Sequence, residues 1–210
     1  MRKKPNKPTE PYGYISFGRD GTVRKGIFQL SHEKDAQESD VMEIFRNGVN
    51  NLSSNLNIVS FSKLPESDHD FRLATSKGPI AVQLTELVEQ DYTTRISKEQ
   101  YKSADYPCVI QKGSGEVILA VDPERLRISL KRCVERKLEK HYAKPSSEML
   151  WLVIFCTSPF LAPEYFEGGK LKISAALVEV RRYLGTVNCV FDEIWYTNLQ
   201  TAPIRIWPDL

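Results

Sequence analysis

Three polar residues on two neighbouring predicted strands could do chemistry together: Asp70, Gln83 and Thr85. Gln83 and Thr85 interrupt an otherwise apolar run, and side chains two apart on a strand point to the same face. Asp70 stands at the start of the preceding strand, where it can lie beside them. A carboxylate next to two polar groups offers the oxygen ligands that Mg²⁺ or Mn²⁺ requires for metal-assisted hydrolysis of a phosphodiester.

The elements that must position these residues follow from hydrophobic periodicity and turn signals. A first helix is predicted over 36–52. A second begins at the N-cap residue Asp122 and ends near Tyr142, and the continuous apolar run at 149–155 is typical of a strand buried on both faces. The other predicted elements are strands at 56–61, 70–75, 80–87, 189–196 and 204–207 and a helix at 171–184.

The resulting order, α-β-β-β-α-β followed by α-β-β, predicts an α/β fold with a mixed sheet flanked by helices. Residues 1–30 are expected to form a basic arm and a hairpin, and residues 31–210 one domain. Within that domain, residues 88–121 are predicted to be an inserted loop that carries a hairpin.

Composition sets limits on the function. With 210 residues and 41% hydrophobic residues the chain fits one domain, and its net charge of +2 does not itself indicate nucleic-acid binding. The four cysteines lack metal-ligand spacing, which argues against structural zinc. The chain shows neither a signal peptide nor an apolar run long enough to span a membrane, so a reduced, cytoplasmic protein is expected.

The element order and the residues Asp70 and Gln83-Leu84-Thr85 resemble the PD-(D/E)xK nuclease superfamily, also called the restriction-endonuclease-like fold. The resemblance covers roughly residues 36–156. It implies that Asp70 takes the role of the conserved Asp, that Gln83 stands at the second acidic position, and that Thr85 stands at the lysine position. Asp70 and Gln83 would then hold Mg²⁺ or Mn²⁺. Asp70 is preferred over Asp68 because it adjoins the apolar strand residues, although it could instead be an ordinary turn residue.

Thr85 cannot replace an ammonium group, so the resemblance requires a cation from elsewhere. In the resembled family, lysines displaced onto the second helix occur, and Lys137 falls in the middle of the apolar face of that helix. A lysine there either assists at the phosphate or extends its head to water at the rim of the sheet. Glu38 on the first helix either completes the site, as acids on that helix often do in the family, or is a first-turn glutamate favoured by the helix dipole.

The resemblance therefore predicts a metal-dependent DNA endonuclease with a non-standard site. DNA is the expected partner, no membrane or organic cofactor is expected, and a homodimer is left open. The first alternative is a catalytically inactive relative that serves as a nucleic-acid-binding or protein-assembly module, since both charged residues of the third strand are missing. The second is an unrelated α/β domain.

Overall fold

The computed structural model describes residues 12–17, 23–28, 33–52, 56–65, 69–87, 110–112, 116–118, 123–140, 142–144, 148–157, 169–199 and 201–208. Residues 1–11, Asp68, Asp122 and most of the insert at 88–121 lie outside them, and the predictions made for those residues stand untested. The division into residues 1–30 and 31–210 also stays a prediction. In the part that is described, no helix is long and apolar enough to cross a membrane.

Six of the described strands form one mixed sheet in the order β10-β9-β8-β5-β4-β3. β4 pairs antiparallel with both β3 and β5. β8 pairs parallel with β5, and β9 pairs parallel with β8. β10 pairs antiparallel with β9 at the far edge. The predicted α/β class and element order are confirmed, and the C-terminal strands extend the same sheet. These strands are β3 (Ile58–Lys63), β4 (Phe71–Thr75), β5 (Gly78–Glu86), β8 (Met149–Phe155), β9 (Glu193–Thr197) and β10 (Ile204–Trp207).

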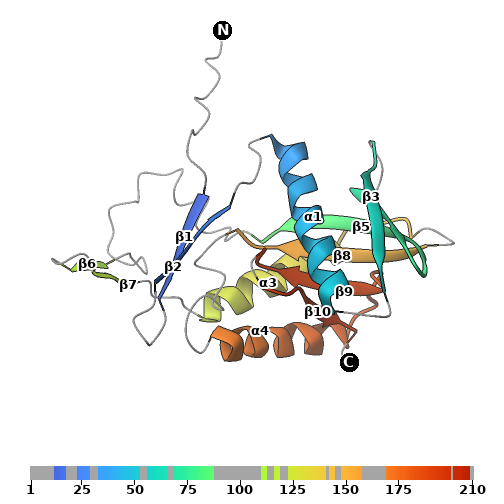
Figure 1. Cartoon of the computed structure of the whole chain (residues 1–210). Coiled ribbons are helices and arrows are strands. Elements are labelled where there is room, and N and C mark those ends of the chain that lie inside the picture. The colour runs from blue at the N-terminus through green and yellow to red at the C-terminus, as the bar shows by residue number, and fades with distance from the viewer. Residues whose placement is uncertain are drawn as a thin grey trace, which may run out of the picture.

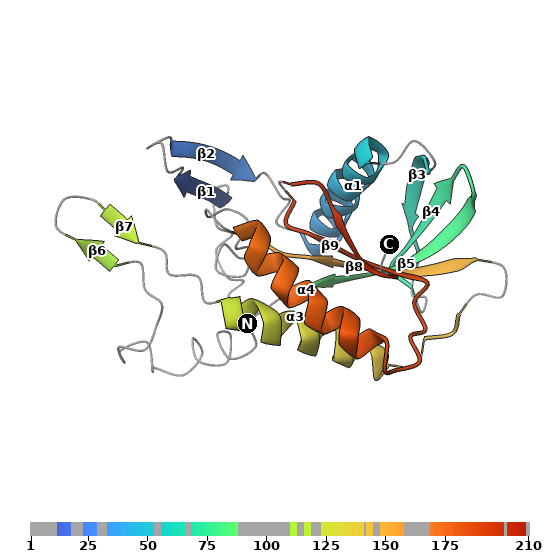
Figure 2. The same cartoon turned by 90° about the horizontal axis from the view of Figure 1, so that it is seen from below.

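Three described helices cover the two faces of the sheet. α1 (Lys34–Leu52) lies over one face, and α3 (Pro123–Leu138) and α4 (Gly169–Leu184) lie side by side over the other (Figures 1 and 2). The remaining described strands form two separate two-stranded sheets, β1 (Tyr12–Phe17) with β2 (Val23–Phe28) and β6 (Ile110–Lys112) with β7 (Glu116–Ile118).

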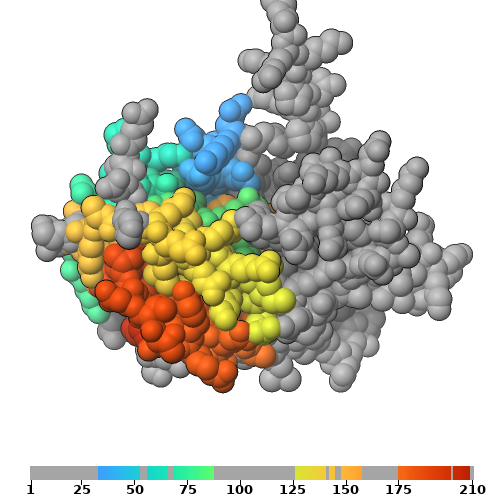
Figure 3. Space-filling view, turned by 180° about the vertical axis from the view of Figure 1, so that it is seen from behind, coloured from blue at the N-terminus to red at the C-terminus, as the bar shows by residue number. Residues whose placement is uncertain are grey.

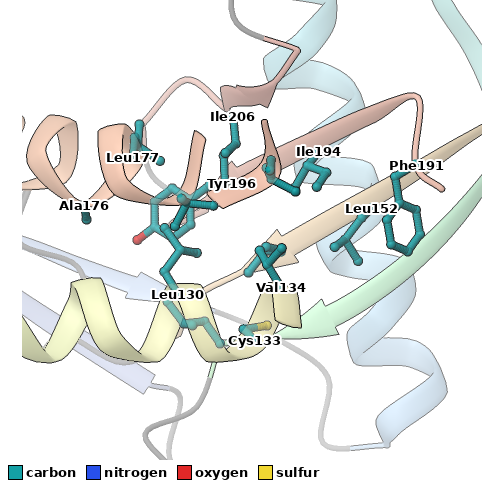
Figure 4. Close-up of a cluster of buried hydrophobic side chains, with 14 of the residues drawn as sticks. Leu130, Cys133, Val134, Leu152, Ala176, Leu177, Phe191, Ile194, Tyr196 and Ile206 are labelled. Carbon is teal, nitrogen blue, oxygen red and sulfur yellow. The ribbon is translucent and has the colours of Figure 1, made fainter. Parts of the chain in front are cut away.

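Each face of the sheet has its own apolar core. On β5, Ile80, Val82 and Leu84 pack with α1, whereas Ala81 packs with α3 and α4. This division follows the alternation of side chains along a strand. Figure 4 shows the second core, in which residues of α3 and α4 meet residues of the central and C-terminal strands.

Several predicted boundaries were wrong by a few residues. α1 begins at Lys34, two residues early, so Glu38 lies beyond the first turn. α3 ends at Leu138, which places Tyr142 outside the helix, and β9 begins at Glu193 because residues 189–192 form no strand. The connection between β4 and β5 was predicted at residues 76–79, whereas the turn is confined to residues 76–77 and β5 already begins at Gly78, whose φ of 114° an L side chain rarely adopts.

Candidate active site

The candidate site lies where β4 and β5 separate. β4 pairs with β5 from Phe71–Val82 to Thr75–Gly78, whereas β8 pairs with β5 as far as Glu86. The last four residues of β5 therefore have a strand partner on the β8 side only, among the described residues. Asp70 stands at this fork: its backbone N–H donates to the carbonyl of Val82 at 3.0 Å, directly before β4 begins.

The side chain of Asp70 completes the edge that β4 leaves open. Its Oδ2 atom accepts a hydrogen bond from the backbone N–H of Leu84 at 2.7 Å and a second one from the amide Nε2 of Gln83. Within the described part of the chain, no hydrogen bond occupies the other carboxylate oxygen, Oδ1. Asp70 thus has one oxygen committed to the fold and one that is available for a ligand.

Gln83 and Thr85 point toward α3, as the alternation of β5 requires. Gln83 is buried, with 8% of its surface exposed, and its Nε2 also lies 3.4 Å from the carbonyl oxygen of Leu84. Burial raises the pKa of the Cys133 thiol on α3, and a hydrogen bond from Thr85 is among the effects that oppose this rise. Both polar residues of β5 are therefore held by partners inside the protein.

Lys137 approaches the same place from α3. Burial lowers the pKa of its ammonium group, the negative charge of Asp70 opposes that lowering, and the nearby cations Lys140 and Arg136 add to it. The half-buried Lys137 therefore lies near enough to Asp70 for their charges to interact, and it lines the same cavity.

One cavity, about 330 Å³ in volume, brings together all five residues predicted from the sequence. Glu38 enters it from α1, Asp70, Gln83 and Thr85 from the fork, and Lys137 from α3. In Figure 3, α1 in blue and α3 in yellow flank a strip of green, the colour of β5. The five remaining lining residues are Lys34, Gln37, Leu84, Glu86 and Phe155.

Glu38 has strong partners of its own. Lys63 on β3 donates to Glu38 and to Asp35 at 2.7 Å each, and Lys34 lies 3.6 Å from Glu38. The hydrogen bonds to Asp35 and Glu38 raise the pKa of Lys63. Glu38 lines the cavity, but its charge is already balanced within the protein.

The sequence analysis missed two residues that bear on the site. Glu86 lines the cavity and accepts a hydrogen bond from Thr157 at 2.5 Å, and its position directly after Thr85 was the signal that could have identified it. Burial, with the charge of Asp70 as the second cause, raises the pKa of Tyr142 to about 12. No sequence signal pointed to Tyr142, because its proximity to Asp70 depends on where α3 ends.

The donor set fits one kind of metal site. No group of three or more His, Cys, Asp or Glu side chains able to hold a metal is found among the described residues. Mg²⁺, however, is commonly bound by one or two carboxylates, several waters and the phosphates of the substrate. Asp70 Oδ1 meets that requirement, whereas Gln83 would have to turn its amide over to present oxygen, because Nε2 now faces Asp70.

Comparisons with known proteins add little to this geometry. No protein-family model matches the chain, and none of the curated proteins compared matches it. Among solved structures, Pyrococcus furiosus SfsA in complex with Ca²⁺ matches with 15% identity over 93% of this chain and 75% of that chain, at a TM-score of 0.28. A TM-score of this size does not carry a property of that protein over to this chain.

Proposed function

We propose that this chain is a metal-dependent DNA endonuclease of the PD-(D/E)xK type that hydrolyses phosphodiester bonds at the cavity between α1 and α3. One observation carries the proposal. Five residues chosen from the sequence for nuclease chemistry, on three elements that are distant along the chain, line the same cavity.

Three of the five residues, Asp70, Gln83 and Lys137, have a defined part in the proposed chemistry. Asp70 holds a divalent metal through Oδ1, with Gln83 as a further ligand once its amide has turned. Lys137 places its ammonium group against the scissile phosphate and stabilises the negative charge that develops there. Thr85 occupies the lysine position of the motif without supplying a charge. When bound, Mg²⁺ or Mn²⁺ supplies Lewis acidity and activates water.

The decisive experiment is a cleavage assay on linear, nicked and single-stranded DNA with Mg²⁺ or Mn²⁺ and with EDTA. Asp70→Ala is expected to lack the metal-dependent cleavage that the wild type shows, and Lys137→Ala is expected to retain only a small part of it. Lys131→Ala is the matched control, since Lys131 is on the same helix but pairs with Glu179 of α4 at 3.6 Å, outside the cavity. Equal loss of cleavage in the control, or no cleavage of any substrate by the wild type, would refute the proposal.

A second candidate function is a catalytically inactive binding or assembly module. Gln83 and Thr85 support it, because both make hydrogen bonds inside the protein. A nuclease site that has lost its charged residues but kept its fold would have such neutral, internally bonded side chains in their place. This reading predicts DNA or protein binding that neither EDTA nor Asp70→Asn changes. Metal-dependent cleavage that Asp70→Ala removes would exclude it.

A further inference from the structure

The two flanks of α3 differ in how their positive charges are balanced. On the flank beside α4, Arg127 forms an ion pair with Glu179, and Lys131 lies 3.6 Å from the same carboxylate. Glu135 and Glu139 also act on that side, because burial raises the pKa of Tyr183 on α4 and the charges of these two glutamates add to the rise. The cations beside α4 are therefore compensated.

The other flank of α3 carries Arg132, Arg136 and Lys140, called the basic flank below. Arg132 and Arg136 are one helical turn apart, Lys140 follows two residues after the helix ends, and all three are exposed. Among the described residues, no acidic side chain forms an ion pair with any of them. The basic flank is thus a row of solvated cations in a chain whose net charge is only +2.

The basic flank is continuous with the cavity. Arg136 directly precedes Lys137, which lines the cavity, and Lys140 follows it by three residues. On the opposite rim, Lys34 of α1 lines the cavity with 85% of its side chain exposed. Because Lys34 pairs with Glu38 at 3.6 Å, the positive charge that borders the cavity without an ion-pair partner among the described residues comes from the α3 side.

The sheet surface beside the basic flank, formed by β3 and β4, carries exposed side chains, most of them polar. Arg72 and Ala74 of β4 point to the α3 side of the sheet, opposite to Phe71 and Leu73, and both are exposed. Their cross-strand partners on β3, Ser62 and Ser60, are exposed on the same side. No described helix covers the side of β3 and β4 that faces away from α1, where Arg72 pairs with Glu148 at 2.9 Å.

We propose that the basic flank binds the phosphate backbone of a DNA strand and leads that strand over the exposed side of β3 and β4 into the cavity. A lipid surface fits less well, because membrane-binding helices combine such cations with a neighbouring apolar face, whereas the apolar face of α3 is buried in the core. The choice of DNA rests on the proposed function, and the location of the contact rests on the charges and exposure of the basic flank.

The test measures DNA affinity in EDTA, so that cleavage plays no part. Fluorescence anisotropy with a labelled oligonucleotide is recorded between about 50 and 200 mM salt, where phosphate contacts dominate the salt dependence. The variant Arg136→Gln/Lys140→Gln is compared with Arg127→Gln/Lys131→Gln, which removes the same charge from the opposite flank. Circular dichroism verifies that both variants are folded.

The basic-flank variant is expected to bind more weakly and to lose about 2 units from the slope of log K against log salt, since each phosphate contact contributes about 0.9. The control variant is expected to retain the wild-type slope. Equal slopes in the two variants, or no DNA binding by the wild type, would overturn the proposal. The proposal would also be overturned if the wild type bound phosphatidylserine vesicles and the basic-flank variant lost that binding to the same extent as DNA binding.

Failure of this proposal can be told apart from failure of the proposed function. If the wild type binds DNA through the basic flank but never cleaves it, the endonuclease assignment fails and the contact surface stands. If the basic-flank variant cleaves DNA with an unchanged KM, the contact surface is wrong and the endonuclease assignment stands.

Discussion

Gln83 donates its side-chain amide to the carboxylate of Asp70 across the point where β4 leaves β5. The same carboxylate oxygen accepts the backbone N–H of Leu84. Asp70 is therefore both a candidate ligand and the residue that closes the fork. Because the two roles use different oxygens, substitutions at Asp70 can separate them.

Asp70→Asn is expected to retain most of the stability and to lose the activity. Its amide oxygen still accepts from Leu84, whereas Asp70→Ala leaves the backbone N–H of Leu84 without a partner and Gln83 Nε2 with only its 3.4 Å contact, and an unpaired buried group costs about 1–3 kcal/mol. We expect Asp70→Ala to unfold at clearly lower urea than Asp70→Asn, and both to lack metal-dependent cleavage. Equal midpoints of unfolding for the two variants would show that the hydrogen bonds of Asp70 do not hold the fork.

Gln83→Glu is expected to create a metal-responsive fold. A glutamate at this position would place a second carboxylate against Asp70, and two like charges so close raise the pKa of the pair and disfavour the folded state. In EDTA at neutral pH we expect a loss of about 1–3 kcal/mol, as for other buried groups without a proper partner. Adding Mn²⁺ or Mg²⁺ should restore the melting temperature of the variant and change that of the wild type less. If neither metal changed the melting temperature of Gln83→Glu, this would argue against a metal at Asp70.

Lys137→Met is expected to stabilise the protein while it impairs the chemistry. The folded pKa of Lys137 lies below its ordinary value of 10.5, chiefly because of burial, so the unfolded chain binds more protons between the two values. The contribution of Lys137 to the free energy of unfolding therefore rises with pH through that window, and is unfavourable below it. Methionine removes this pH dependence and the cost of burying the charge, so it should raise the melting temperature at neutral pH.

Cleavage by Lys137→Met should fall by about 10²–10³-fold, the usual cost of removing one group that stabilises transition-state charge. Lys131→Met serves as the control for both measurements. A Lys137→Met protein that is less stable but fully active would assign Lys137 to the rim of the sheet, where it would only extend to water.

Local patterns were sufficient to predict most of the fold and to select five residues that line one cavity. Gln83 and Thr85 stood out because they are polar in an apolar strand, and Lys137 because it is charged on an apolar helix face; both signals are short-range. What the sequence could not provide is the partner of each group. That Lys63 holds Glu38, or that Thr85 meets Cys133, depends on how strands and helices from distant segments pack.

The extent of the pairing between β4 and β5 could not be predicted from the sequence either. The strands were predicted at 70–75 and 80–87, but nothing local indicated that β4 would leave β5 at Asp70 while β8 continues to Glu86. The fork is what opens the edge of β5, so the cavity itself is a property of the sheet topology. Glu86 became a lining residue for the same reason.

Glu38→Gln is expected to change activity by less than about threefold. Its carboxylate is paired with Lys63 and Lys34, and an amide at this position keeps a hydrogen bond to Lys63 through its oxygen. Partly exposed ion pairs contribute about 1 kcal/mol or less, so the stability should change little. Kinetics of cleavage over a range of Mg²⁺ concentrations provide the measurement. A loss above tenfold that high Mg²⁺ rescues would place Glu38 among the metal ligands.

Gly48→Ala is expected to destabilise the protein, although alanine normally stabilises a helix interior by about 1 kcal/mol relative to glycine. Gly48 lies in α1, where an added Cβ would sit 2.5 Å from Cδ of Pro203 in the segment before β10. The ring of Pro203 cannot rotate away, so α1 or that segment must shift, at the cost of about 1–3 kcal/mol typical of overpacking. Urea unfolding of Gly48→Ala beside Gly48→Ala/Pro203→Ala tests this, because removing the ring should recover the loss. A single variant that is more stable than the wild type would mean that α1 does not pack against Pro203.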